Sequence, residues 1–220
     1  MLYDLDGTLL DTAADIMLAL NRMLAEYGWR DMRESEVRRM IGRGGTVLVE
    51  RTAEAQQRVL GAAELTAMVD RFYHFYGLLE QQQEAVAQPY PGVVDGIRRL
   101  RAAGLRSAVV TNKQHRFAVE LMQRLQLEPY LDLIVGGDTC ERRKPDPQPL
   151  LYACAQLGVD PQQTVSVGDS TNDVQAARAA GIPVVCVTWG YNEGQDPREL
   201  PADAFIDAFT ELPALLRLPF

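Results

Sequence analysis

The pattern of hydrophobic and polar residues differs between two parts of the chain. From Thr12 to about Ala87, apolar residues recur at helical spacing, and no strand pattern interrupts them. We expect helices over residues 12–27, 34–41, 46–60 and 63–79, with breaks in the glycine-rich stretch 42–45 and at Gly61. Residues 80–88 are polar, and the rigid sequence Pro89-Tyr90-Pro91-Gly92 then predicts a domain boundary.

After Gly92 short apolar runs alternate with helical patterns. We expect strands over 106–110, 131–135, 164–167, 183–188 and 205–206, and helices over 93–103, 116–127, 148–157, 174–180 and 210–216. Continuous apolar strands that alternate with helices are typical of a parallel sheet covered on both faces. The predicted fold is therefore α/β, with a doubly wound parallel sheet in a Rossmann-like core of residues 1–13 and 88–220 and a helical insert of residues 14–87.

Composition and charge narrow the class of protein. The 220 residues are 47% hydrophobic and 24% charged, as in ordinary soluble globular proteins. The chain is long enough to bury a hydrophobic core without disulfides or structural metals. The net charge of −8 argues against a nucleic-acid partner and an anionic membrane surface. Neither a leader peptide nor a membrane-spanning run is recognisable, and the three cysteines have no Cys-x-x-Cys spacing, so we expect free thiols in the cytoplasm.

The chemistry of the chain begins with two carboxylates at its amino end. Met1, Leu2 and Tyr3 form a short apolar run that stops at Asp4-Leu5-Asp6-Gly7-Thr8. On an extended segment, residues two apart point the same way, so both carboxylates can face one site beyond the strand. A hard divalent cation such as Mg²⁺ would offset their repulsion. Taken alone, the pair is equally compatible with turn residues or a helix cap.

Other strand ends resolve this ambiguity, because ligands bind at the carboxyl ends of the strands in such sheets. Thr111-Asn112-Lys113 follows one predicted strand, Lys144 lies in the loop after the next, and Gly168-Asp169-Ser170-Thr171-Asn172-Asp173 follows a third. Carboxylates, a hydroxyl group and a lysine are thus expected to converge at one edge of the sheet.

These motifs, in this order and each after an apolar strand, resemble the four motifs of the haloacid dehalogenase superfamily, and the resemblance covers the whole chain. The helical insert looks like the helical cap of that family. The phosphoglycolate phosphatase branch of that family has the most similar residues at positions 110–113, 144–147 and 168–173 and at Gly190-Tyr191-Asn192. Only three residues precede Asp4, fewer than is usual in the family, so we expect either a strand frayed at its start or an amino terminus given too short.

The resemblance implies roles for the carboxylates. Asp4 would be the nucleophile that forms an aspartyl-phosphate, and Asp6 the general acid and then the general base. Asp4, the backbone carbonyl of Asp6 and Asp169 would hold Mg²⁺, with Asp173 in or just behind the coordination sphere. Asp173 is also placed to cap the helix that starts near Val174. Dehalogenases of this fold lack an acid at the position of Asp6, so the resemblance implies phosphoryl transfer.

The resemblance also implies a phosphate site. Thr111 and the amide of Asn112 would bind the phosphoryl oxygens, and Lys144 would pair with Asp4 and the phosphate. The alternatives are a helix-capping role for Thr111 and an exposed loop position for Lys144. We expect Lys113 and His115, which follow directly, to be solvated or capping residues.

Substrate specificity is the least defined part of the prediction. Arg43, in the glycine-rich break of the insert, is a candidate to grip a substrate carboxylate, although a solvated surface arginine explains it equally well. Tyr191 and Asn192 either lie near the site or shape the loop after the last long strand.

The sequence thus predicts a Mg²⁺-dependent phosphatase, monomeric or homodimeric, whose partner is a small phosphorylated metabolite, with 2-phosphoglycolate the favoured substrate. The alternatives are a hexose or amino-sugar 6-phosphate phosphatase, a phosphomutase, and a non-catalytic binding or regulatory module. The intact set of Asp4, Asp6, Thr111, Lys144 and Asp169 weighs against the last of these.

Overall fold

A six-stranded parallel sheet forms the centre of the larger part of the molecule. In the computed structural model, which describes residues 1–216, its strand order is β5-β4-β1-β6-β7-β8. The strands are β1 (Leu2–Tyr3), β4 (Ala108–Val110), β5 (Leu133–Val135), β6 (Ser166–Gly168), β7 (Val184–Val187) and β8 (Ala204–Ile206). The shortest strand, β1, lies in the middle and pairs in parallel with β4 and β6. The doubly wound α/β fold is thereby confirmed.

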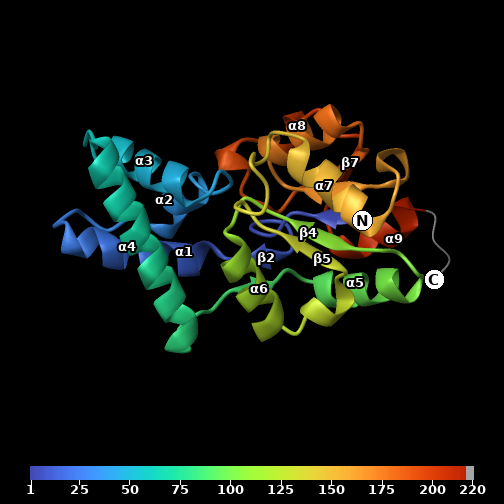
Figure 1. The fold of residues 1–220 in the computed structure, drawn as a ribbon, viewed down its shortest axis with the longest axis horizontal. Coiled ribbons are helices and arrows are strands. Elements are labelled where there is room, and N and C mark those ends of the chain that lie inside the picture. The colour runs from blue at the N-terminus through green and yellow to red at the C-terminus, as the bar shows by residue number, and fades with distance from the viewer. Residues whose placement is uncertain (217–220) are drawn as a thin grey trace.

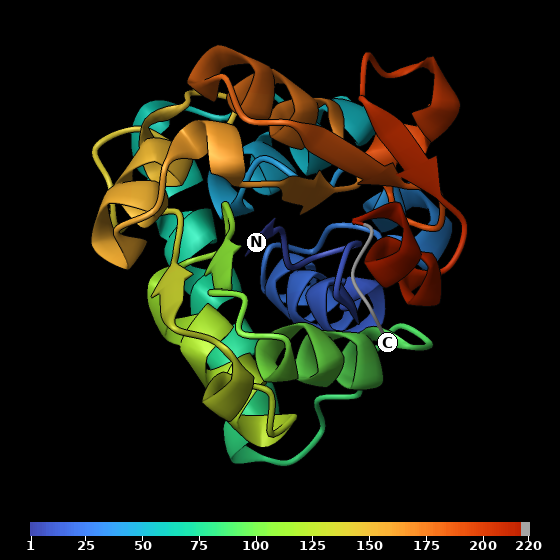
Figure 2. The ribbon, with the colours of Figure 1, turned by 90° about the vertical axis from the view of Figure 1, so that its right-hand side faces the viewer.

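Helices cover both faces of this sheet (Figure 2). On one face lie α5 (Val93–Ala102), α6 (His115–Arg124) and α9 (Leu212–Leu215), and on the other α7 (Gln148–Leu157) and α8 (Thr171–Ala180). Side chains of β1 alternate between the two layers, because Tyr3 packs with Val109 and Phe209 whereas Leu2 packs with Val184. Burial on both faces explains why the strands read as continuous apolar runs.

The helical insert forms a second body beside the sheet (Figure 1). We call helices α1 (Ala13–Glu26), α2 (Glu34–Arg38), α3 (Gly45–Ala55) and α4 (Ala62–Gln81) the helical cap. They share a hydrophobic cluster, which includes Leu20, Met68 and Phe72 and is joined by Phe117 and Tyr191 of the core. This second cluster supports a division of the chain into core and cap, and the boundaries at 13/14 and 87/88 stay predictions.

Element ends differ from the predicted ones where the hydrophobic pattern runs on past a turn. Helix α3 ends at Ala55 and not at Leu60, because Gln57 adopts a left-handed conformation with φ of 56° and the chain leaves the helix there. The apolar residue Val59, which extended the predicted helix, is 97% exposed. Helix α2 likewise ends at Arg38, and residues 39–41 form a turn.

The two crossings between core and cap pair with each other. Strand β2 (Leu10–Asp11) lies antiparallel to β3 (Gln88–Pro89), with Leu10 opposite Pro89 and Asp11 opposite Gln88. The sequence does not predict this pair, since two residues are too few to show a strand period. No helix within residues 1–216 is both long and apolar enough to cross a membrane.

Candidate active site

The carboxyl ends of three central strands meet at one place. Asp4 follows β1, and its amide donates a hydrogen bond to the carbonyl of Val167 at 2.9 Å, which fixes it beside β6. Thr111 follows β4 and Asp169 follows β6, so both lie at the same edge of the sheet. The predicted convergence of polar groups at this edge is found in the structure.

Three carboxylates form a cluster there. Asp4, Asp169 and Asp173 each offer an oxygen within 4.8 Å of the others. Burial raises the pKa of Asp4 well above its usual value, Lys144 opposes this, and the Asp173 and Asp169 carboxylates add to it. Burial and then Asp173 raise the pKa of Asp169 to about 7. Three carboxylates with one ammonium group among them leave negative charge in excess, and their oxygens are the ligands that a hard divalent cation takes.

Lys144 is fully committed to this cluster. Its Nζ donates to Asp4 Oδ1 at 2.7 Å, to Asp173 Oδ1 at 2.6 Å and to the Val110 carbonyl at 2.6 Å. An ammonium group has three donors, so all of them are used. Although burial disfavours the charged form, the Asp173 and Asp4 carboxylates raise the pKa of Lys144 above its usual value. The alternative of an exposed loop lysine is wrong, since the side chain is 5% exposed.

Asp173 caps helix α8 and also belongs to the carboxylate cluster, and its role at a metal stays a prediction. Its Oδ2 accepts hydrogen bonds from the Ser170 amide at 3.1 Å and the Ser170 hydroxyl at 2.6 Å, which forms a capping box at the start of α8. Its Oδ1 faces Lys144. The capping bonds hold the carboxylate in the cluster.

The backbone around Asp169 is arranged to receive its carboxylate. Oδ2 accepts from the Tyr191 amide at 2.7 Å and lies 3.5 Å from the Asn192 amide, while the Thr8 hydroxyl donates to Oδ1 at 3.1 Å. Gly7 has φ of 91°, and a Cβ there would lie 2.5 Å from Asp169 Oδ2. Tyr191 and Asn192 therefore lie at the site, and their backbone amides contact it.

The Tyr191 side chain serves a different purpose. Its hydroxyl oxygen accepts from the amides of Thr12 at 2.8 Å and Ala13 at 3.1 Å, and the hydroxyl donates to Asp11 Oδ1 at 2.8 Å. These bonds tie the loop after β7 to the first crossing into the cap.

Asp6 stands apart from the three-carboxylate cluster. Its Oδ1 accepts from the Thr12 hydroxyl at 2.6 Å, and Lys113 Nζ lies 2.9 Å from Oδ1 and 3.2 Å from Oδ2. The prediction that Lys113 is solvated or capping is wrong, because its side chain is 7% exposed and its ammonium lies 4.6 Å from the ring centroid of Tyr76. His115 is exposed, as expected.

Thr111 and Asn112 lie between the carboxylates and the cap. The Thr111 hydroxyl oxygen accepts from the Lys113 amide at 3.2 Å. The Asn112 side chain donates to the carbonyls of Gly42 and Lys144, each at 2.9 Å. Asn112 thereby joins the core to the glycine-rich loop of the cap, which the sequence did not indicate.

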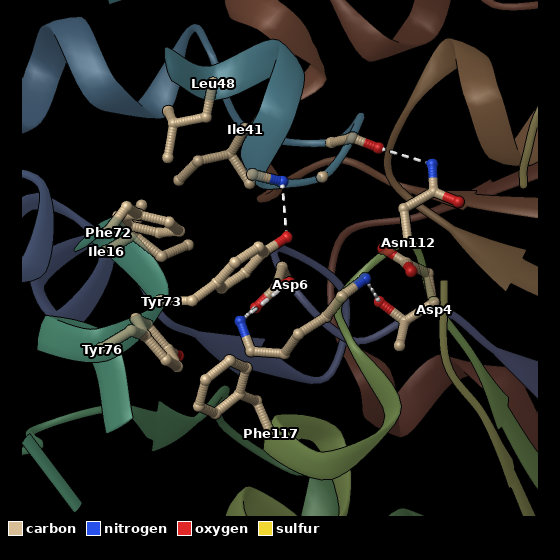
Figure 3. Close-up of a pocket in the computed structure, with 15 residues that line it drawn as sticks. Asp4, Asp6, Ile16, Ile41, Leu48, Phe72, Tyr73, Tyr76, Asn112 and Phe117 are labelled. Atoms are coloured by element: carbon tan, nitrogen blue, oxygen red, sulfur yellow. Dashed lines mark hydrogen bonds and ion pairs between the residues drawn. The ribbon is translucent and has the colours of Figure 1, made fainter. Parts of the chain in front are cut away.

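A small cavity of about 50 Å³ opens between cap and core at this point (Figure 3). Asp4, Asp6, Thr111, Asn112 and Lys113 form its polar side. The cap supplies an apolar side of aliphatic and aromatic residues: Ile16, Ile41, Leu48, Phe72, Tyr73 and Tyr76. The two carboxylates at the end of β1 thus face a partly open cavity that suits a small ligand.

Arg43 is directed elsewhere in this structure. Its Nε donates to Glu193 Oε1 at 2.9 Å, Arg51 Nη2 reaches the same oxygen at 2.8 Å, and Arg43 does not line the cavity. That Arg43 grips a substrate carboxylate stays a prediction.

Comparison with known proteins extends these observations. The model of the haloacid dehalogenase-like hydrolase family matches residues 1–187, which include every site residue predicted from the sequence. The phosphoglycolate phosphatase of Nitrosospira multiformis is 40% identical over 221 residues, covering 99% of this chain and 95% of that protein. The plasmid phosphoglycolate phosphatase of Cupriavidus necator is 44% identical over 218 residues, covering 98% of this chain and 92% of that protein.

A solved structure has the same fold over nearly its whole length. The crystal structure of a predicted phosphoglycolate phosphatase from Haemophilus somnus matches with a TM-score of 0.91 and 30% sequence identity, covering 98% of this chain and 96% of that one.

Proposed function

The chain belongs to the haloacid dehalogenase-like hydrolase family and is a phosphoric monoester hydrolase, and we propose that it hydrolyses a small organophosphate, 2-phosphoglycolate before others, to glycolate and phosphate. The observation that carries this proposal is the placement of Asp4 and Asp6 on one cavity, with Asp4 in the buried cluster and Asp6 outside it. Two carboxylates in different surroundings suit two roles, a nucleophile and a proton carrier.

In the proposed reaction, an oxygen of Asp4 attacks phosphorus, and the bond from phosphorus to the ester oxygen breaks. Asp6 gives its proton to the departing alkoxide and so releases the alcohol. Asp6 then takes a proton from water, which attacks the aspartyl-phosphate and releases phosphate and the free carboxylate of Asp4. Thr12, whose hydroxyl donates to Asp6 Oδ1 at 2.6 Å, orients that carboxylate toward the cavity.

Phosphate recognition is assigned to Thr111 and the Asn112 amide, and Lys144, whose donors are all used within the cluster, contributes its positive charge through Asp4. Thr111 and Asn112 line the cavity next to Asp4, and the Lys144 ammonium touches Asp4 directly. Positive charge at this point counters the approach of a phosphate dianion to an anionic nucleophile. The apolar cap side keeps bulk water away from the intermediate.

The acidic cluster fits a hard divalent cation, which we take to be Mg²⁺. Asp4, the Asp6 carbonyl and Asp169 would hold it, with Asp173 supporting the cluster through Lys144 and Ser170. When bound, the ion supplies charge neutralisation between nucleophile and phosphate. The three free cysteines, Cys140, Cys154 and Cys186, support a reducing compartment such as the cytoplasm.

Phosphate release from a panel of esters tests this proposal. The panel contains 2-phosphoglycolate, hexose and amino-sugar 6-phosphates and an aryl phosphate, each with Mg²⁺ and with EDTA. We expect Mg²⁺-dependent release, highest from 2-phosphoglycolate, which is lost in Asp4→Asn and kept in Asp70→Asn, a matched change at an exposed position on α4. Preference for a sugar phosphate would contradict the substrate, and no release from any ester would contradict the mechanism.

A further inference from the structure

Lys113 supplies the only positively charged side chain among the residues that line the cavity, all of which lie within residues 1–216. It belongs to the loop after β4, and its aliphatic stem and ammonium are 7% exposed. The ammonium contacts Asp6 on one side and the face of the Tyr76 ring, on helix α4 of the cap, on the other. Asp6 offsets the cost of burying this cation, and a bound anion beside the ammonium would add to that effect.

Lysine is used sparingly in this chain, which makes its position informative. Of 22 basic residues, 20 are arginines, and the two lysines are Lys113 and Lys144. An ammonium group is a compact point charge with rotatable donors, unlike the planar guanidinium group. Both lysines contact carboxylates of the active site. All three donors of Lys144 are used, whereas the two hydrogen bonds of Lys113 both go to the carboxylate of Asp6.

Tyr76 provides a second polar group at the same place. Its side chain is 4% exposed, and its hydroxyl has no hydrogen-bond partner in the described part of the chain. Burial raises the pKa of Tyr76 to about 12, so the hydroxyl keeps its proton and is able to donate. A buried hydroxyl without a partner is free to donate a hydrogen bond to a bound ligand. The neighbouring walls formed by Ile16, Phe72 and Phe117 are apolar.

We propose that Lys113 and Tyr76 bind the second anionic group of the substrate, the carboxylate of a phosphorylated 2-hydroxy acid. The inference rests on the proposed function and specifies how its substrate class is selected. Asp6 faces the leaving-group oxygen in the proposed reaction, and Lys113 is in direct contact with Asp6. In 2-phosphoglycolate one methylene separates that oxygen from the carboxylate, so a cation next to Asp6 is within reach of it.

The location of Lys113 on the core and of Tyr76 on the cap gives this recognition a further property. A carboxylate bound between Lys113 and Tyr76 contacts both the core and the cap. The binding site for this carboxylate is therefore complete only when the cap lies over the core, as in Figure 3. A phosphate ester without this carboxylate makes the phosphate contacts alone.

The two lysines allow a direct test by magnetic resonance. In Asp4→Asn protein labelled with ¹⁵N-lysine, only two side-chain ammonium signals arise, and Lys113→Met assigns them. The probes are 2-phosphoglycolate and 2-hydroxyethyl phosphate, which carries a hydroxymethyl group in place of the carboxylate. We expect both probes to shift the Lys144 signal and 2-phosphoglycolate alone to shift the Lys113 signal. A Lys144 shift without a Lys113 shift overturns the inference, and a lack of any shift with 2-phosphoglycolate overturns the proposed function.

Kinetics in the otherwise unaltered enzyme supply a second readout. Lys113→Met should lower kcat/KM for 2-phosphoglycolate on the order of 10- to 100-fold more than for 2-hydroxyethyl phosphate, as expected for loss of one charge-assisted hydrogen bond. Tyr76→Phe should change the same ratio in the same direction, by less. Arg99→Met, a matched change at an exposed position on α5 that does not line the cavity, should leave the ratio unchanged.

Two results would overturn the inference. Equal losses on both esters in Lys113→Met would assign Lys113 to Asp6 alone. A loss of selectivity in Arg43→Gln without one in Lys113→Met would place the carboxylate at Arg43.

Discussion

Gly190 lies directly against Asp169, and its replacement by alanine tests whether the position of that carboxylate controls the site. A Cβ at residue 190 would lie 2.1 Å from the Cβ of Asp169 and 2.4 Å from its Oδ2. Gly190 does not have a positive φ, so alanine is compatible with the backbone, and the three atoms nearest to its Cβ all belong to the Asp169 side chain.

The size of the effect follows from what holds Asp169. To make room, its carboxylate has to leave the Tyr191 amide at 2.7 Å or the Thr8 hydroxyl at 3.1 Å. Loss of one hydrogen bond to a charged group together with overpacking lowers the free energy of unfolding by about 2–4 kcal/mol. Disturbing the groups that orient a metal ligand typically lowers metal affinity by roughly 10- to 100-fold, so under the proposed role of Asp169 the Mg²⁺ concentration at half-maximal activity should rise by that factor.

Urea unfolding and a Mg²⁺ titration of phosphatase activity measure the two effects. The control is Gly61→Ala, because Gly61 has an ordinary φ of −73° and nothing lies within 4 Å of a Cβ there. If Gly190→Ala matches Gly61→Ala in both stability and Mg²⁺ requirement, the reasoning that places Asp169 at the metal is refuted.

Three further predictions concern stability. Burial and Asp173 raise the pKa of Asp169 to about 7, so between about pH 4 and pH 7 the folded metal-free protein holds a proton on Asp169 that the unfolded chain has released. The free energy of unfolding should therefore fall as the pH rises through this range. Urea titrations with EDTA at pH 5 and 8 measure this fall, and Asp169→Asn should reduce it. Phe209→Ala should cost about 3–5 kcal/mol by the same method, because the ring is fully buried against Gly96 and Tyr3, and a loss below about 1 kcal/mol would contradict its place in the core. Asp15→Ala should speed hydrogen exchange at the Val86 and Ala87 amides, which donate to that carboxylate at 2.7 and 3.1 Å, and unchanged exchange would contradict the role of Asp15 in anchoring the second crossing.

The fold and the polar edge of the sheet were predictable because they depend on local pattern. Asp4, Thr111 and Asp169 each follow an apolar run directly. Such a run indicates a strand, and the polar residue after it lies at the carboxyl end of that strand. The parallel arrangement brings these three residues to one edge of the sheet, whereas the contacts of Lys144 depend on the loop between β5 and α7.

Lys113 was misjudged because its surroundings come from distant segments. The local sequence indicates only that Lys113 follows a strand. It does not indicate that Tyr76, on a cap helix, covers the Lys113 ammonium. The pairing of Arg43 with Glu193 is equally non-local, since 150 residues separate them. The single cue available was the scarcity of lysine in a chain rich in arginine.

The pairing of β2 with β3 limits how the cap is able to move. Both connections run side by side with their register fixed by Leu10 and Pro89, and the Tyr90 amide donates to the Leu9 carbonyl at 3.0 Å beside them. Hydrogen bonds between antiparallel segments resist sliding but allow the ribbon to bend. We therefore expect any movement of the cap relative to the core to be mainly a rotation about this ribbon. One spectroscopic distance, between labels at Arg43 and Glu193 on opposite sides of the mouth, would then follow the entire opening and closing coordinate.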